Sequence, residues 1–177
     1  MQQALRRASL VPVGFVVESA FCQADRTVIT VRPSGSLGLC PSCGTVSQRV
    51  HSYYRRCVTD LPLSGRIVQL VVIARRFRCD AVLCGRQIFT ERFSEDVLAS
   101  SARRSTRLDC IVHHLGLALG GRPAASFAKR LMLPVSNDTL LRVVRRRSRP
   151  PADPLRVVGI DDWAWRRNHR YASIVCN

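Results

Sequence analysis

Two close pairs of cysteines constrain this chain more than any other feature of its sequence. Cys40 and Cys43 are separated by two residues, Cys79 and Cys84 by four, and a glycine follows each pair. Two thiolates at such a spacing can reach one tetrahedral zinc ion, and the trailing glycine permits the tight turn that brings backbone N–H groups near sulfur. The 35 residues between the pairs are enough for two or three strands. The spacing therefore predicts a zinc ribbon.

Two other interpretations of the pairs are small buried hydrophobic residues and a redox dithiol. A redox motif would stand at the start of a helix after a strand, whereas no helical pattern follows Cys43. Cys57 and His51 lie between the pairs and could replace one ligand, although a structural or DNA-contacting role suits His51 and Tyr54 better. Four cysteines have no partner at ligand spacing: Cys22, Cys57, Cys110 and Cys176.

The charge of the chain is strongly lopsided. It carries 28 Lys+Arg against 12 Asp+Glu, a formal net charge of +16, and Lys129 is its only lysine. Such a charge indicates a polyanionic partner, either nucleic acid or an anionic membrane surface.

No apolar run reaches the about 18 residues that a membrane-spanning helix needs, so we expect no integral membrane protein. Pro12, Gly14 and Glu18 interrupt the first apolar stretch, which argues against a signal peptide and for reduced or metal-bound thiols in the cytosol.

Period and composition divide the chain into four segments and predict an α+β chain of several modules. Residues 11–32 have strand patterns, and residues 37–95 hold both cysteine pairs with a β-like insert. Helical spacing begins after residue 96, and a stiff proline-rich linker at 150–154 precedes two short apolar strands. The expected segments are 1–36, an N-terminal β segment; 37–95, the zinc ribbon; 96–149, a helical module; and 150–177, the linker and the first strands of a further domain.

The helical segment predicts a first helix that Gly120 and Gly121 end. A second helix should begin with Pro123 at N1 and run to about Leu131, with Phe127 and Leu131 turned inward. The expected buried face of the first helix consists of Leu108, Ile111, Val112, Leu115 and Leu119.

A third helix is predicted after Pro134, which cannot continue the second one. Ser136 suits the N-cap, and Asp138 in the first turn suits the helix dipole. The expected buried stripe of this helix is Leu140, Leu141 and Val144.

A helix, a short turn and a capped helix form the helix-turn-helix arrangement, whose second helix lies in the major groove of DNA. The alternative is a generic helical bundle with a basic face. Residues near the start of the third helix would face base edges, and the arginines toward its end, with two in the ribbon, would contact phosphates. The candidate base contacts are Asn137, Asp138 and Thr139, and the candidate phosphate contacts are Arg142, Arg145, Arg146, Arg147, Arg75 and Arg76.

The tail holds two adjacent acids, Asp161 and Asp162, which we expect at the end of a short apolar strand. Carboxylates at a strand end can hold Mg²⁺, and a pair of such ions can activate water or a 3′-hydroxyl against a phosphodiester. Successive side chains on a strand point to opposite faces, so one of the two should face the site.

Six runs of the sequence, taken together, resemble one known family over about residues 12 to 177. They are Cys40–Gly44, His51–Arg55, Asp60–Gly65, Arg75–Cys79 through Cys84 with Ile88–Arg92, Pro134–Arg142, and Gly159–Arg167 ending in His169–Tyr171. The chain resembles the N-terminal part of a bacterial insertion-sequence transposase of the zinc-ribbon, helix-turn-helix and DDE type. The resemblance implies a zinc ribbon, a helix-turn-helix that binds terminal inverted repeats, and the first strands of an RNase H-like core. It also implies that Asp161, rather than Asp162, is the first acid of the DDE triad.

Two departures from the family pattern bear on activity. Asn168 stands where the family usually has glycine, and the sequence stops at Asn177 before the second Asp and the final Glu of the triad. An RNase H-like sheet needs about five strands, and two unaccompanied strands are marginal in water. We therefore expect a C-terminally truncated transposase that neither cuts nor joins DNA by itself.

The expected cofactor is a structural Zn²⁺, with Mg²⁺ bound only if a complete DDE site is assembled. The expected partner is double-stranded DNA with the terminal repeats of the element, in the bacterial cytoplasm at the nucleoid; a second copy of the chain and an intact transposase are further partners. Two alternatives stay open: a split or frameshifted transposase to which Asp161 contributes, and a free-standing repressor that occupies the ends of the element. A zinc-ribbon module for protein interaction explains the charge of +16 least well.

Overall fold

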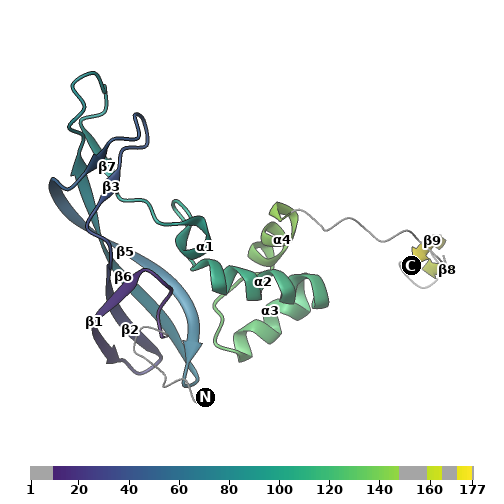
Figure 1. Cartoon of the computed structure of the whole chain (residues 1–177). Coiled ribbons are helices and arrows are strands. Elements are labelled where there is room, and N and C mark those ends of the chain that lie inside the picture. The colour runs from purple at the N-terminus through teal and green to yellow at the C-terminus, as the bar shows by residue number, and fades with distance from the viewer. Residues whose placement is uncertain (1–9, 148–158, 165–170, 177) are drawn as a thin grey trace, which may run out of the picture. The chain divides into compact units, whose positions relative to one another are not determined.

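The computed structural model describes residues 10–147, 159–164 and 171–176. The chain divides into two compact units, Met1–Arg145 and Arg146–Asn177. It combines sheets with helices, which confirms the expected α+β class (Figure 1). The elements are β1 (Phe15–Cys22), β2 (Arg26–Pro33), β3 (Gly38–Leu39), β4 (Val46–Ser47), β5 (Val50–Leu63), β6 (Arg66–Arg78), β7 (Ile88–Thr90), α1 (Glu95–Leu98), α2 (Thr106–Leu119), α3 (Gly121–Arg130), α4 (Asn137–Arg146), β8 (Gly159–Ala164) and β9 (Tyr171–Cys176).

A long antiparallel hairpin of β5 and β6 is the main feature of the largest sheet. Ser64 and Gly65 join the two strands with φ of +50° and +70°, the left-handed conformation that suits a tight hairpin turn. Along β6, Val68, Leu70 and Val72 are buried and alternate with half-buried residues. This alternation is typical of a sheet that packs one face on a core.

The N-terminal strands belong to the same sheet as this hairpin. β1 pairs with β2 in an antiparallel manner, and β2 lies parallel to β6, with Thr27 opposite Val68 and Val31 opposite Val72. The sequence predicts a segment boundary at residue 36, whereas the structure joins the strands on either side of it into one sheet. The connection from β2 to β6 contains the first cysteine pair and the whole of β5, as a parallel pairing requires a long crossover.

The inner face of the sheet is covered by the N-terminal segment and by α1. Leu98 of α1 is buried there, and the rings of Phe15 and Phe93 have centroids 5.1 Å apart. The buried residues of this core are Val11, Phe15, Ile29, Val31, Val58, Val68, Leu70, Val72, Ala74 and Leu98.

Helices α2, α3 and α4 pack around a second core. α3 begins at Gly121, two residues before Pro123, which still lies in the first turn, where its missing N–H costs no helical hydrogen bond. The backbone amide of Thr139 donates to Oγ of Ser136 at 3.3 Å, which confirms the predicted cap of α4. The buried residues of this core are Leu108, Val112, Ala124, Ala128, Leu133, Leu140 and Val143.

The predicted inward face of α3 is wrong. Phe127 and Leu131 are 46 % and 43 % exposed, whereas Ala124 and Ala128 are fully buried. Small side chains let this helix lie close to its neighbours, whereas Phe127, one position before Ala128, and Leu131, just after the helix, remain on the outside. Similar shifts place Ile111 and Leu119 of α2 on the exposed side and bury Val143 in place of Val144, which is half-buried like Leu141.

β8 and β9 form a separate two-stranded antiparallel sheet. Asp161 pairs with Ile174 and Asp162 with Ser173, so both acids lie within β8 and not at its end as expected. Their side chains, and the expected strand residues 155–158, lie outside the described residues. No helix in the described part of the chain is long and apolar enough to cross a membrane.

Candidate metal centre and nucleic-acid interface

The two cysteine pairs meet at one point in the fold. The Sγ atoms of Cys40, Cys43, Cys79 and Cys84 all lie within 4.8 Å of one another. The distance from Cys43 Sγ to Cys79 Sγ is 3.5 Å, and that from Cys40 Sγ to Cys84 Sγ is 3.9 Å. Four sulfurs at about 2.3 Å from one zinc ion in a tetrahedron lie about 3.8 Å apart. The two observed separations lie on either side of this value, so the cluster has about the size of a four-cysteine zinc site.

Backbone hydrogen bonds shape the first of the two turns. The amide of Cys40 donates to the Thr45 carbonyl, and the amide of Gly44 donates to the Cys40 carbonyl, both at 2.9 Å. Gly44 has φ of +73°, a conformation that a side chain would strain. The glycine after Cys43 is thus required by the turn, as the spacing predicts.

The second turn is built differently and is connected to the first. The Cys79 amide donates to the Gln87 carbonyl at 2.9 Å, and the Cys84 amide donates to the Ala81 carbonyl at 3.1 Å. Gly85 has no left-handed φ, so the second trailing glycine is not required in the way that the first one is. Nε of Arg86 donates to Oγ of Ser42 at 2.9 Å, and this contact joins the two turns.

A small aromatic core supports the four sulfurs. The rings of Phe77 and Phe89 stack with centroids 5.7 Å apart, and they form one buried cluster with Cys40. A Cβ on Gly38 would lie 2.5 Å from the Phe77 ring, so only glycine fits there. The cysteines at the ends of β6 and β3 are therefore held by packing as well as by their turns.

The surroundings lower the pKa of the Cys43 thiol and raise that of the Cys79 thiol. The hydroxyl and the backbone amide of Thr45 lower the pKa of Cys43 to about 6. For Cys79 the backbone amide of Ala81 acts in the same direction, but burial and the sulfurs of Cys43 and Cys40 outweigh it and raise the pKa to about 12. Four thiols this close cannot all ionise unless a cation lies between them. Zinc binds the thiolate form, so this donor set suits it.

Two alternatives for the cysteines can be compared with this geometry. Among the described residues, the cluster of metal-ligating side chains contains neither His51 nor Cys57, which are both exposed on β5. The described cysteines form no disulfide. The side chains that the structure brings together are therefore the four cysteines of the two pairs, which could hold one metal ion.

The segment that contains both pairs also matches a known family. Residues 36–84 match the model of the zinc-finger of transposase IS204/IS1001/IS1096/IS1165. No curated protein and no solved structure matches the chain. The matched residues include β3 to β6 and all four cysteines of the cluster. The chain thus carries a zinc-ribbon domain of this transposase type, which supports an N-terminal region of an insertion-sequence transposase with a structural zinc.

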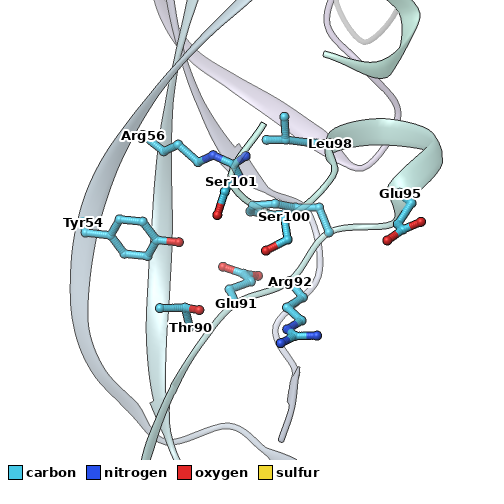
Figure 2. Close-up of a pocket in the computed structure, with 10 residues that line it drawn as sticks. Tyr54, Arg56, Thr90, Glu91, Arg92, Glu95, Leu98, Ser100 and Ser101 are labelled. Carbon is cyan, nitrogen blue, oxygen red and sulfur yellow. The ribbon is translucent and has the colours of Figure 1, made fainter. Parts of the chain in front are cut away.

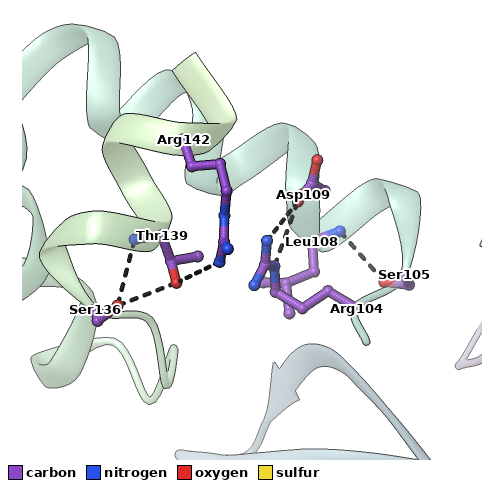
Figure 3. A network of polar contacts seen from close by, with 7 residues as sticks. All are labelled: Arg104, Ser105, Leu108, Asp109, Ser136, Thr139 and Arg142. Atoms are coloured by element: carbon purple, nitrogen blue, oxygen red, sulfur yellow. Dashed lines mark hydrogen bonds and ion pairs between the residues drawn. The ribbon is translucent and has the colours of Figure 1, made fainter. Parts of the chain in front are cut away.

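The start of α4 carries the candidate base-contacting residues. Oγ of Ser136 lies 3.0 Å from Oγ1 of Thr139, which accepts from Nη2 of Arg142 at 3.4 Å (Figure 3). Asp138 is exposed and Thr139 half-buried. Oδ1 of Asn137 is instead buried without a hydrogen-bond partner among the described residues, at the point where a Cβ on Gly121 would meet it. The structure therefore places Asn137 in the contact between α3 and α4.

The candidate phosphate-contacting arginines fall into two groups. Arg142, Arg145 and Arg146 are exposed on α4, and Arg147 is half-buried just after it. Arg75 differs, because it forms an ion pair with Glu91 in which the two side chains are only 13 % and 6 % exposed. The hydrogen bonds with Glu91 raise the pKa of Arg75, and its Nη2 also donates to the Gly35 carbonyl at 2.7 Å.

The last of these candidates is Arg76, whose guanidinium carbon lies 4.9 Å from the centre of the Tyr54 ring. This cation–π contact leaves the side chain half-buried on β6. Arg75 thus joins β6 to the strand after the zinc site, whereas Arg76 stays accessible beside an aromatic ring.

One group of residues that no sequence pattern indicates connects the sheet with α2. The side chain of Asp60 on β5 is 0 % exposed and forms an ion pair with Arg107. Its Oδ1 accepts from Oγ of Ser105 at 2.6 Å and from Nε of Arg107 at 2.8 Å. Ser105 also caps α2, because its Oγ accepts from the Leu108 amide at 3.3 Å. The local sequence shows only that Asp60 is an acidic residue in a stretch that forms a strand. It does not indicate that Ser105 and Arg107 are the partners of this carboxylate.

Proposed function

We propose that the 177 residues are a zinc-dependent DNA-binding region of an insertion-sequence transposase, and that their target is the terminal inverted repeats of the element. The observation that carries this proposal is the four-sulfur cluster inside a segment that matches a transposase zinc-finger. The net charge of +16 supports a nucleic-acid partner, because arginine–phosphate contacts supply most of the sequence-independent affinity for DNA.

Within this proposal, α3 and α4 act as a helix-turn-helix. The short six-residue connection 131–136 and the Ser136 cap support it, since the second helix of such a pair enters the major groove with its N-terminal residues near the bases. Asp138 and Thr139 then face base edges, while Asn137 holds α4 against α3. The expected phosphate contacts are Arg142, Arg145, Arg146, Arg147 and Arg76.

We further propose that these residues bind DNA without cutting it. DDE chemistry uses three acids that hold metal ions at the scissile phosphate, and the family resemblance assigns Asp161 as the first of them. Cleavage then requires two carboxylates in addition to Asp161. A 5′-labelled terminal-repeat duplex incubated with the 177-residue chain and Mg²⁺ should remain intact, and a product of defined length would contradict this part of the proposal.

The binding proposal is tested by fluorescence anisotropy with a duplex of the terminal repeat and a scrambled duplex of the same composition. The zinc-loaded chain should prefer the repeat, and log Kd should rise steeply and linearly with log salt concentration. Arg142→Ala should weaken binding to both duplexes about equally and reduce the slope of the salt dependence by about 1, as the loss of one phosphate contact does. Arg26→Ala is the matched control, because Arg26 forms an exposed pair with Asp25 on β2. Equal affinity for both duplexes would contradict the proposed specificity.

A further inference from the structure

β5 attaches the helical module to the sheet through groups that lie within five consecutive residues. Nη2 of Arg56 donates to the carbonyls of Ala99 and Ala102, at 2.8 and 2.6 Å. Figure 2 shows this arginine beside Ser100 and Ser101, at a hollow of about 390 Å³ between β5 and α1. Burial lowers the pKa of Arg56, and the two acceptors of these bonds are neutral carbonyls that carry no compensating charge.

The backbone of Thr59 forms the second attachment. Its amide donates to the Arg103 carbonyl at 2.9 Å, and its carbonyl accepts from the Ser105 amide at 3.0 Å. Residues 103–105 thus run beside β5 like a short parallel strand. This pairing leads directly into α2, so the start of the helix is fixed to the strand.

Asp60 forms the third attachment, together with Ser105 and Arg107; we name these three residues the Asp60 latch. Nη2 of Arg107 also donates to the Leu10 carbonyl at 2.9 Å, so the latch includes the N-terminal segment. A fully buried carboxylate is costly unless it is paired, and here one hydroxyl and one guanidinium satisfy it. The arrangement holds only while all three groups keep their positions.

The zinc site lies at the other end of the same strand. Val50, the first residue of β5, pairs with Phe77, and Cys79 follows β6 by one residue. Asp60 is ten residues further along β5, and at about 3.3 Å per residue this corresponds to about 33 Å of strand. One turn of B-DNA is about 34 Å long. The strand therefore separates the zinc end from Asp60, the most distant of the three attachments, by about one turn of a double helix.

We propose that the Asp60 latch fixes the helical module at this separation, so that the zinc end and α4 contact one face of a duplex at a set spacing. This inference rests on the proposed DNA binding. Exposed arginines occur in both regions, Arg78 beside the zinc site and Arg142 and Arg145 on α4, and they supply the charge that two separate phosphate contacts need. Asp60 is a positioning residue: it touches no DNA, and its removal changes the tolerance for spacing and not only the affinity.

The first measurement needs no DNA. Spin labels on p-acetylphenylalanine at Gln48 and Ser126, both exposed, report the distance between the zinc end and α3 in the zinc-loaded full chain. The wild type should give one narrow distance distribution, and Asp60→Asn a broad one. Asp25→Asn is the matched control, since it removes one carboxylate from an exposed ion pair and should leave the distribution narrow. A narrow distribution for Asp60→Asn would overturn the latch.

The second measurement uses a duplex that the wild-type chain selects from a random-sequence pool. Hydroxyl-radical footprinting should show two protected segments about one helical turn apart. Insertion of five base pairs between them should weaken binding by about 100-fold for the wild type and for Asp25→Asn, because two linked contacts become one. For Asp60→Asn and Ser105→Ala the same insertion should cost clearly less.

The two hypotheses fail in different ways. If the wild type selects no duplex from the pool, the proposed DNA binding is wrong, and the spin-label distances still decide whether the latch exists. If the wild type binds but protects one segment, or tolerates the insertion, DNA binding stands and the fixed spacing is overturned. Zinc content and circular dichroism of each variant show that it is folded, and Ser105→Ala, which keeps the Asp60–Arg107 pair, provides the milder variant.

Discussion

Gly44 and Gly85 follow the two cysteine pairs in the same way, yet the structure assigns them different roles. A Cβ would meet no atom within 4 Å at either position, but Gly44 alone of the two has a left-handed φ, +73°. A side chain in that conformation costs about 1–2 kcal/mol. Gly44→Ala should therefore weaken zinc binding about tenfold in competition with a chromophoric chelator. Gly85→Ala should leave it nearly unchanged, and equal losses in both variants would contradict this account of the turn.

The thiol pKa values predict how many protons zinc releases. Zinc binds thiolates, so each ligand that is protonated in the metal-free chain must lose its proton. Cys43, with a pKa of about 6, is mostly protonated at pH 5 and mostly ionised at pH 7.5, whereas Cys79, with a pKa of about 12, is protonated at both. Calorimetry in buffers of different ionisation enthalpy should show about one proton fewer released at pH 7.5 than at pH 5. An identical number at both pH values would contradict the lowered pKa of Cys43.

Among the secondary-structure elements, α2 and α4 are joined by a close approach at Gly116. A Cβ there would lie 2.7 Å from Cγ2 of Val144. Overpacking in Gly116→Ala should therefore lower the unfolding free energy by about 1–3 kcal/mol. The higher helix propensity of alanine offsets about 1 kcal/mol of this loss. Val144→Ala removes the clashing methyl, and the double variant should recover most of the loss. Gly35→Ala, where no atom lies within 4 Å, serves as the control. Urea unfolding measures the wild type and these four variants, and additive losses in the double variant would argue against the contact.

The helices also show which structural features a local sequence pattern can predict and which it cannot. The Ser136 cap and the position of the turn at Pro134 depend on neighbouring residues, and they could be predicted. Which face of α3 is buried depends on the two other helices, and the pattern favours Phe127 because it is large and apolar. The alanines of α3 are buried instead, because their small side chains let α3 lie close to the other two helices in the shared core.

In the molecule as a whole, the metal site was the most predictable part and the connections between modules the least. Spacing alone brings Cys40 near Cys43, and the trailing glycines mark the two turns. The pairing of β2 with β6 joins residues about 40 positions apart, and nothing local in either strand indicates it. The same holds for Asp60, whose partners lie 45 and 47 residues further along the chain.

Native mass spectrometry of the purified 177-residue chain can show whether one zinc ion holds the fold together, because it counts bound metal and reports compactness in one experiment. We expect one zinc ion per chain, lost on treatment with a strong chelator together with a shift to more highly charged, expanded ions, and regained when zinc is added back. A chain that is compact without metal, and whose charge states do not change with the chelator, would contradict it.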